Sequence, residues 1–205
     1  MAKRTFSLVR VVDDDEEYRR SEAFMLRMMG LNVAEYAGAL QFLEEDDPEV
    51  PGCVILDVRM PGMDGIELQE AMSGKSIGLP VIFLTGHGDV EMAVSALHKG
   101  AADFLLKPAD PEKLKAAVDR ALAKSEELFA RKAEETEAKE RFAQLTERER
   151  DVCVRIARGM LNKQIAIELG ISEHTVKVHR ASVKYKLKAK TPLELKAILA
   201  LAGVA

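Results

Sequence analysis

The chain has 205 residues, of which 47% are hydrophobic and 31% are charged, and its formal net charge is −4. This balance is typical of a globular protein and excludes a collagen-like or largely disordered chain. No apolar run approaches the roughly 18 residues that a membrane span requires, so we expect a cytoplasmic protein with no membrane partner. Cys53 and Cys153 each lie in an apolar run, which favours buried free thiols over a disulfide.

Five short apolar runs alternate with segments of helical periodicity through the first part of the chain. The runs occupy residues 7–12, 31–36, 53–57, 80–85 and 102–107. The first intervening segment, residues 16–30, shows the 3.6-residue spacing of a helix at Tyr18, Ala23/Phe24 and Met28. This alternation predicts an α/β fold of the (βα)5 type, in which a doubly wound parallel sheet has helices on both faces.

Polar residues stand at the carboxyl ends of four of these runs, where such sheets bind their ligands. They are Asp13 and Asp14, Asp57, Thr85 and Lys107. Two like charges about 4 Å apart repel by roughly 4 kcal/mol at an effective dielectric near 20, so crowded carboxylates need a divalent cation. Mg²⁺ suits a shallow cleft because it favours carboxylate, water and phosphate oxygens. Lys107 and Thr85 match phosphoryl oxygens, and Asp57 is the expected nucleophile that forms an aspartyl phosphate.

Four stretches of this region carry a family resemblance, namely VVDDDEE, CVILDVRMPGMDG, VIFLTGHGD and ADFLLKP. They resemble the receiver domain of two-component response regulators over residues 5–123, with the five signature positions present in order. The resemblance implies that Asp57 accepts a phosphoryl group from a sensor histidine kinase, and that Thr85 and Lys107 bind this group. It also implies that Mg²⁺ is held by the carboxylates of Asp13, Asp14 and Asp57 and by the backbone carbonyl of Arg59.

Phe104 stands three residues before Lys107, where the family keeps an aromatic side chain whose rotamer couples to the threonine. The resemblance therefore implies a switch formed by Phe104 and Thr85, although a phenylalanine packed in the core needs no such role. Asp15, the third acid in a row, is expected to cap the first helix.

The segment from residue 109 to residue 141 reads as one helix, and its later part is highly charged. Eleven of the 18 residues from Lys124 to Arg141 are charged, and apolar positions are sparse. We interpret residues 124–143 as a solvated helical linker, with a weak coiled-coil seam between two chains as the alternative.

The charge changes sign along the chain, which indicates different partners for its two ends. Residues 1–123 carry 13 Lys and Arg against 22 Asp and Glu, whereas residues 145–205 carry 12 against 6. The basic end contains four helical segments and no strand pattern. We therefore predict a receiver domain over 1–123, a linker over 124–143, and an all-α four-helix domain over 144–205.

The third helical segment of the basic end, SEHTVKVHRASVKYKL, has two different faces. Val176, Val183 and Leu187 form an inward stripe, and the opposite face is polar and basic. Together with the segment that ends at Gly170, it predicts a helix-turn-helix whose second helix enters the major groove of double-stranded DNA. Residues 144–200 resemble output domains of the LuxR/FixJ/NarL type, and both halves together resemble FixJ-like regulators.

By this resemblance two groups of residues contact DNA. Base edges are expected to face Lys177, Val178 and Ala181, of which the two apolar side chains suit thymine methyl groups. Phosphates are expected to be bound by Lys163, Thr175, His179, Arg180 and Lys184. Leu193 to Leu201 present an apolar face that relatives use for pairing on DNA, and a plain core helix is the alternative.

The two resemblances imply a response regulator rather than an enzyme. Phosphorylation of Asp57 is expected to control dimerisation and sequence-specific DNA binding, and with them transcription by RNA polymerase. A phosphatase of the haloacid dehalogenase kind is disfavoured, since it needs a second acid two residues after the nucleophile, where Arg59 stands. A phosphorylation-independent regulator, with the receiver as an interaction module, is the remaining alternative.

Overall fold

The computed structural model describes residues 7–86 and 90–204. Residues 1–6, 87–89 and 205, which belong to the predicted domains, lie outside the described residues. Contacts divide the chain into two compact units, Met1–Phe129 and Ala130–Ala205. Within the described part, none of the helices combines the length and the apolar character that a membrane crossing needs.

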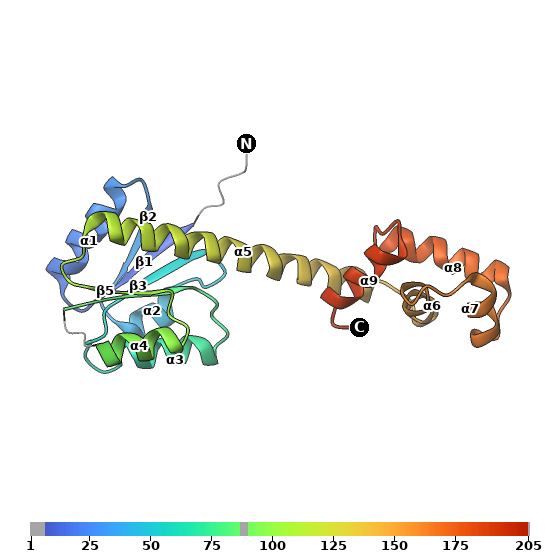
Figure 1. Cartoon of the computed structure of the whole chain (residues 1–205), viewed down its shortest axis with the longest axis horizontal. Coiled ribbons are helices and arrows are strands. Elements are labelled where there is room, and N and C mark those ends of the chain that lie inside the picture. Colours follow the sequence, from blue (N-terminus) through green and yellow to red (C-terminus); the bar gives the residue numbers. More distant parts are fainter. Residues whose placement is uncertain (1–6, 87–89, 205) are drawn as a thin grey trace. The chain divides into compact units, whose positions relative to one another are not determined.

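The first unit is built on a parallel sheet, which has five strands in the described residues (Figure 1). Their order in the sheet is β2-β1-β3-β4-β5, so the chain changes direction of winding at β1 and β3. The strands are β1 (Leu8–Val12), β2 (Asn32–Tyr36), β3 (Gly52–Leu56), β4 (Val81–Thr85) and β5 (Asp103–Leu106). The predicted doubly wound fold is therefore confirmed, and each strand falls within a residue or two of its predicted run.

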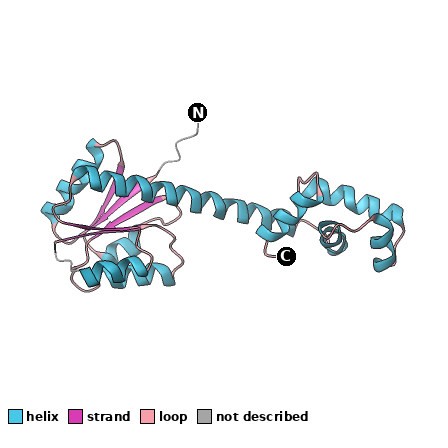
Figure 2. Ribbon diagram, in the orientation of Figure 1, coloured by secondary structure: helices cyan, strands magenta, loops and turns pink. Residues whose placement is uncertain are grey.

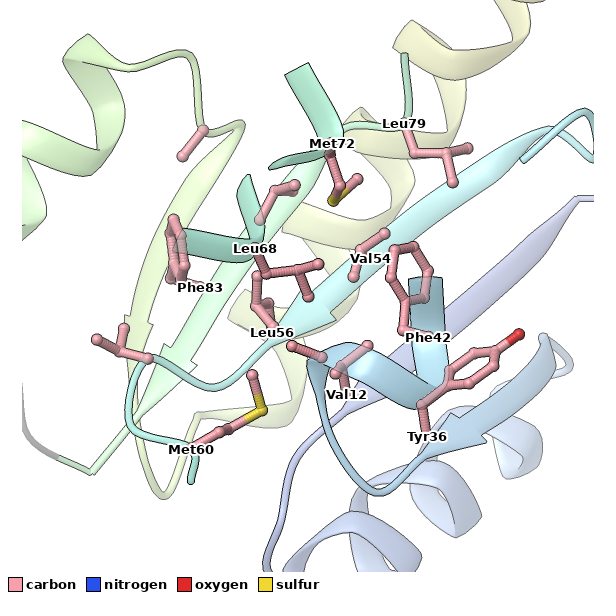
Figure 3. Close-up of a cluster of buried hydrophobic side chains, with 14 of the residues drawn as sticks. Val12, Tyr36, Phe42, Val54, Leu56, Met60, Leu68, Met72, Leu79 and Phe83 are labelled. Atoms are coloured by element: carbon pink, nitrogen blue, oxygen red, sulfur yellow. The ribbon is translucent and has the colours of Figure 1, made fainter. Parts of the chain in front are cut away.

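Helices cover both faces of this sheet (Figure 2). One face carries α1 (Glu16–Met28) and α5 (Pro111–Ala143), and the other carries α2 (Ala39–Glu45), α3 (Gly65–Gly74) and α4 (Val90–His98). Successive residues of a strand point to opposite faces. Ile55 accordingly packs with Leu114 and Val118 of α5, while Leu56 joins Leu68 of α3 in the second core, part of which Figure 3 shows.

Helix α1 differs in one respect from its predicted pattern. Asp15 caps it as expected, because its carboxylate accepts the Tyr18 backbone N–H at 3.0 Å. Of the residues that the spacing placed on the apolar stripe, Ala23 is 0% exposed, whereas Phe24 and Met28 are 65% and 74% exposed. The buried stripe instead includes Glu22. Because the buried side of α1 contains the acid Glu22, the apolar residues alone place the buried side at the wrong angle around the helix axis.

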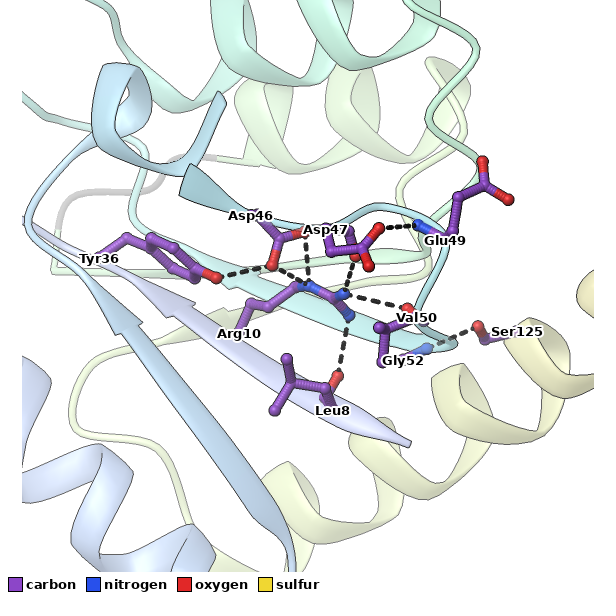
Figure 4. Close-up of polar contacts among 9 residues, drawn as sticks. All are labelled: Leu8, Arg10, Tyr36, Asp46, Asp47, Glu49, Val50, Gly52 and Ser125. Atoms are coloured by element: carbon purple, nitrogen blue, oxygen red, sulfur yellow. Dashed lines mark hydrogen bonds and ion pairs between the residues drawn. The ribbon is translucent and has the colours of Figure 1, made fainter. Parts of the chain in front are cut away.

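A buried ion pair fastens the amino-terminal end of the sheet (Figure 4). Arg10 of β1 is 0% exposed, and its Nε donates to both carboxylate oxygens of Asp46 at 2.7 and 2.8 Å. The other guanidinium nitrogens donate to backbone carbonyls of Leu8, Asp47 and Val50. The Tyr36 hydroxyl also donates a hydrogen bond to Asp46 Oδ1 at 2.6 Å. A buried charge is tolerated when it is both paired and hydrogen-bonded in this way.

The second unit contains α6 (Glu147–Ala157), α7 (Asn162–Leu169), α8 (Glu173–Lys186) and α9 (Pro192–Leu201), in agreement with the predicted helical segments. Val176, Val183 and Leu187 are each 0% exposed, so the predicted inward stripe of α8 is confirmed. Leu195 and Leu199 of α9 join the same core, although Leu193 is 78% exposed.

Glu149 links α6 to α8 inside this core. Its carboxylate accepts Ser182 Oγ at 2.5 Å and Lys186 Nζ at 2.7 Å. Burial raises the pKa of Glu149, but Lys186 and Ser182 outweigh it and lower the pKa from 4.5 to about 2. The contribution of the ionised group to stability is therefore present above the unfolded value and is lost as pH falls through about 2.

The predicted helix before the basic domain is present as α5, which runs without interruption from Pro111 to Ala143. Most of its side chains after Phe129 are exposed, as the solvated interpretation requires, and Ala138 is buried. The linker limits of 124 and 143 and the alternative coiled-coil seam stay predictions. Cys53 and Cys153 are buried free thiols, as expected.

Replacing Asp46 by alanine should destabilise the first unit by about 3 to 5 kcal/mol, because it leaves the Arg10 guanidinium buried without its counter-charge. Urea unfolding followed by circular dichroism measures this. The matched control is Asp119→Ala, which removes the exposed partner of Lys115 and should cost less than about 1 kcal/mol. Equal effects of the two substitutions would contradict the assigned role of the pair.

Candidate functional site

The carboxylates predicted from the sequence meet at the carboxyl edge of the sheet. β1 and β3 are neighbours in register, with Val12 opposite Leu56, so the residues that follow them, Asp13 and Asp57, also lie side by side. The Asp57 backbone N–H donates to the Val12 carbonyl at 3.0 Å, which extends the ladder by one residue. Carboxylate oxygens of Asp13, Asp14 and Asp57 lie within 4.8 Å of one another. Asp13 and Asp57 are buried, whereas Asp14 is exposed.

Lys107 reaches this cluster from the end of β5. Its backbone N–H donates to the Thr85 carbonyl at 2.9 Å, and its Nζ lies 2.6 Å from Asp13 Oδ2 and 3.2 Å from Asp57 Oδ1. Burial lowers the pKa of Lys107, but the carboxylates of Asp13 and Asp57 outweigh it, so the pKa lies above its ordinary value. The ammonium is therefore charged at neutral pH and bridges the two buried acids.

The electrostatics of Asp13 show how crowded the cluster is. Burial raises the pKa of Asp13, Lys107 and the Asp15 backbone oppose that rise, and the Asp57 charge adds to it. Burial is thus the main cause of the raised pKa and the Asp57 charge adds to it, so a further cation would stabilise the ionised carboxylate.

The cluster fits a magnesium ion by the chemistry of its donors. Three carboxylates supply hard oxygen ligands of the kind that Mg²⁺ prefers. The Arg59 backbone N–H donates to Asp57 Oδ2 at 3.1 Å, which brings the backbone of Arg59 beside the carboxylate. The Arg59 carbonyl as a ligand stays a prediction.

Thr85 and Phe104 also lie at or near this edge. Thr85, the last residue of β4, is 1% exposed and stands in register with Leu106. Phe104 of β5 is partly buried, and its ring lies 6.0 Å from the ring of Phe83, centroid to centroid. The Thr85 carbonyl thus accepts the Lys107 backbone N–H at this edge, and Phe104 lies on the neighbouring strand; their coupling stays a prediction.

Gly65, the first residue of α3, allows the chain to fold back against Asp57. Its backbone N–H donates to the Val58 carbonyl at 2.9 Å. A Cβ atom built on Gly65 would lie 2.2 Å from the carbonyl oxygen of Asp57, where no side chain fits. The helix therefore begins with glycine because its backbone touches the backbone of the phosphoacceptor candidate.

Two residues of α1 beside the cluster were missed by sequence reasoning. Lys107 Nζ lies 4.3 Å from the centroid of the Tyr18 ring. Glu22, one turn further along, is 5% exposed. Burial raises the pKa of Glu22 to about 7, while the Lys107 charge opposes the rise. The spacing offered one signal for Glu22: it stands four residues after Tyr18 and four before Leu26, which places it on the same side of the helix as these two residues.

In the second unit α7 and α8 form a helix-turn-helix. Gly170 ends α7 with φ of 65°, a left-handed conformation that favours glycine. Ser172 then caps α8, since its hydroxyl accepts the Thr175 backbone N–H at 3.0 Å. The short turn leaves one face of α8 open to solvent along its length.

Seven of the predicted DNA-contacting residues belong to α8, and Lys163 belongs to α7. The exposed ones are Lys163, Lys177, Val178 and Ala181, and the partly buried ones are Thr175, His179, Arg180 and Lys184. Arg180 Nη1 already donates to Asn162 Oδ1 at 2.9 Å, so this side chain also braces α8 against α7. Tyr185, which the sequence reasoning missed, is 85% exposed and lies four residues after Ala181. The DNA roles stay predictions.

Comparisons with known proteins cover both units. Residues 9–119 match the family described as the response regulator receiver domain, and residues 143–198 match bacterial regulatory proteins of the luxR family.

Similar proteins share this order of domains over nearly the whole chain. The transcriptional regulatory protein FixJ of Azorhizobium caulinodans is 44% identical over 96% of this chain and 93% of its own length. The response regulator protein TodT of Pseudomonas putida is 39% identical over 92% of this chain and 83% of its own. The solved structure of the response regulator StyR, at 41% identity, covers 95% of this chain and 98% of its own with a TM-score of 0.87.

Replacing Gly65 by alanine should lower the stability of the first unit by about 1 to 3 kcal/mol, since the added methyl group displaces the Asp57 backbone. Gly74→Ala at the other end of α3 is the matched control, because its Cβ would meet open space and alanine gains about 0.5 to 1 kcal/mol over glycine in a helix. Denaturation of both variants measures the difference. If Gly65→Ala were as stable as Gly74→Ala, the close approach would be wrong.

Proposed function

The chain belongs to the response regulators that join a receiver domain to a LuxR-type DNA-binding domain, and we propose that its receiver accepts a phosphoryl group on Asp57. One observation carries this proposal. Lys107 Nζ contacts both Asp13 and Asp57 in a cluster of three carboxylates at the carboxyl edge of the sheet. An acid used only to cap a helix or face solvent would not be buried beside a second acid and in contact with a lysine.

The residues of the site suit in-line phosphoryl transfer. A carboxylate oxygen of Asp57 attacks phosphorus, and the bond to the leaving group breaks as the new oxygen–phosphorus bond forms. Lys107, 3.2 Å from Asp57, is placed to neutralise a phosphoryl oxygen, and Thr85 at the end of β4 offers a hydroxyl donor. Mg²⁺, held by Asp13, Asp14, Asp57 and the Arg59 carbonyl, would supply further charge neutralisation at the transferred group.

The donor that we propose is the phosphohistidine of a sensor histidine kinase. The protein then serves as an acceptor of phosphate and not as an enzyme that turns over an external substrate. Arg59 supports this assignment, because a phosphatase of the haloacid dehalogenase kind would need a carboxylate at that position to act as its acid or base. The charged end of Arg59 cannot donate and take back a proton in this way.

The basic helix-turn-helix supports sequence-specific binding of double-stranded DNA. Lys177, Val178 and Ala181 lie exposed on α8, as a helix that reads base edges requires. Lys163, Thr175, His179, Arg180 and Lys184 would bind phosphates. We place the protein in the cytoplasm, where the DNA is.

Phosphorylation must act through conformation, since it adds about −1.5 to −2 charges at a site on the other domain. Shifting an equilibrium from 1:99 to 99:1 takes about 5.5 kcal/mol of differential stabilisation. We propose that Thr85 and Phe104 transmit the change, that the phosphorylated chain forms a homodimer, and that the DNA-bound dimer regulates transcription by RNA polymerase.

Asp57→Asn should abolish phosphorylation, because an amide is not a nucleophile toward phosphorus. Wild type incubated with acetyl phosphate and Mg²⁺ should give a shifted band in phosphate-affinity electrophoresis, and the variant should not. Binding to an operator selected from random DNA should tighten with the phosphodonor for wild type alone. Equal operator affinity of wild type and variant with the donor present would refute control by phosphorylation, and would favour the receiver as a phosphorylation-independent module.

Alanine substitutions of two lysines should change DNA affinity in different ways if the DNA assignment holds. Lys163→Ala should weaken binding to every sequence alike and reduce the slope of log affinity against log salt by about 1. Lys177→Ala should cost about 1 to 3 kcal/mol on the selected operator and less on random DNA. Lys196→Ala on α9 is the charge-matched control. Fluorescence anisotropy over a salt series tests all three, and identical behaviour of the variants would contradict the assignment.

A further inference from the structure

The Lys107 ammonium contacts the aromatic ring of Tyr18 as well as the two carboxylates. Nζ lies 4.3 Å from the ring centroid, within the roughly 6 Å over which a cation is attracted by an aromatic face. Tyr18 belongs to the first turns of α1, while Lys107 follows β5. The contact is therefore made between segments that are distant in sequence.

Two neighbours of the Tyr18 hydroxyl, Glu22 and the Ala109 backbone, affect its pKa. Burial, followed by the charges of Glu22 and Asp13, raises the pKa of Tyr18 to about 12, so its hydroxyl stays neutral. The Ala109 backbone, two residues after Lys107, also acts on that hydroxyl. In the described part of the chain, Glu22 Oε1 is buried without a hydrogen-bond partner. The carboxyl group of Glu22 is thus kept beside Tyr18 and Lys107 rather than released to water.

Magnesium creates a problem for Lys107. The closest partner of its ammonium is Asp13, at 2.6 Å, and Asp13 is also a proposed ligand of the metal. When the carboxylate of Asp13 turns to a cation, its hold on the ammonium weakens. A lysine on a flexible four-carbon stem then has more rotamers available, and its contact with Asp57 is the longer one, at 3.2 Å. A ring face that carries no ionisable charge at neutral pH does not compete for the metal and can keep the ammonium in place.

We propose that Tyr18, supported by Glu22, is a positioning residue that keeps Lys107 directed at Asp57 while Asp13 binds the metal. This inference rests on the proposed function, because it concerns the phosphoryl transfer itself. Its direct consequence is that the ring contributes to the maximal rate of phosphorylation, and not to the binding of Mg²⁺ or of the donor.

The test measures the rate of phosphorylation of the full chain by acetyl phosphate over a range of Mg²⁺ and donor concentrations. Tyr18→Leu should lower the maximal rate about two- to tenfold, the range expected for loss of a cation–π contact. Its half-saturating concentrations of Mg²⁺ and acetyl phosphate should stay within about twofold of wild type. Tyr18→Phe, which keeps the ring, should restore most of the rate.

The matched control is Phe24→Leu, which removes an aromatic ring from the exposed face of the same helix and should leave the rate unchanged. If Tyr18→Leu proves unfolded by circular dichroism, Tyr18→Met replaces it as an unbranched side chain of closer length. Wild-type rate in the ringless variant, an equally slow Tyr18→Phe, or a shift confined to half-saturation would each overturn the inference. Failure of wild type to become phosphorylated would instead overturn the proposed function.

Discussion

The contact of one ammonium group with two buried carboxylates is the interaction on which the first unit depends. The parallel sheet forces Asp13 and Asp57 together, because β1 and β3 are neighbours and end at the same edge. Their repulsion would weaken the fold if Lys107 did not lie between them at 2.6 and 3.2 Å. Lys107 contacts two of the three clustered carboxylates and Arg19 donates to the Asp13 backbone carbonyl, which leaves carboxylate oxygens for a divalent cation. Stability and reactivity thus have a common source at this edge.

Much of this could be predicted because strand ends and polar residues coincide in the sequence. Five apolar runs gave the strands to within a residue or two, and the order of the sheet then brings Asp57, Thr85 and Lys107 to one edge. The contribution of α1 could not be predicted in the same way. Glu22 breaks the apolar pattern from inside the core, and a periodicity argument reads such an acid as a solvent-facing residue. The contact of Tyr18 with Lys107 depends on packing across the sheet edge, which spacing along one helix does not encode.

The second unit shows a similar division between pattern and packing. The stripe of Val176, Val183 and Leu187 could be predicted because its residues repeat at helical spacing. The structure buries all three completely. The links that join one helix to another were not readable. Glu149 connects α6 to α8, and Arg180 connects α8 to α7 through Asn162. These polar contacts add to the apolar core in holding α8 against α6 and α7.

The two ends of the sheet differ in how completely their buried charges are hydrogen-bonded. At the amino-terminal end five hydrogen bonds of the Arg10 guanidinium saturate a buried charge, and rearrangement there would break several of them together. At the carboxyl edge, the charges of Asp13, Asp57 and Lys107 compensate one another only in part. Each contact of Lys107 there can be replaced by itself. The Arg10 end therefore resists rearrangement more than the edge that holds Asp57. We expect the sheet to adjust to a change at Asp57 along that edge, where single contacts can be replaced.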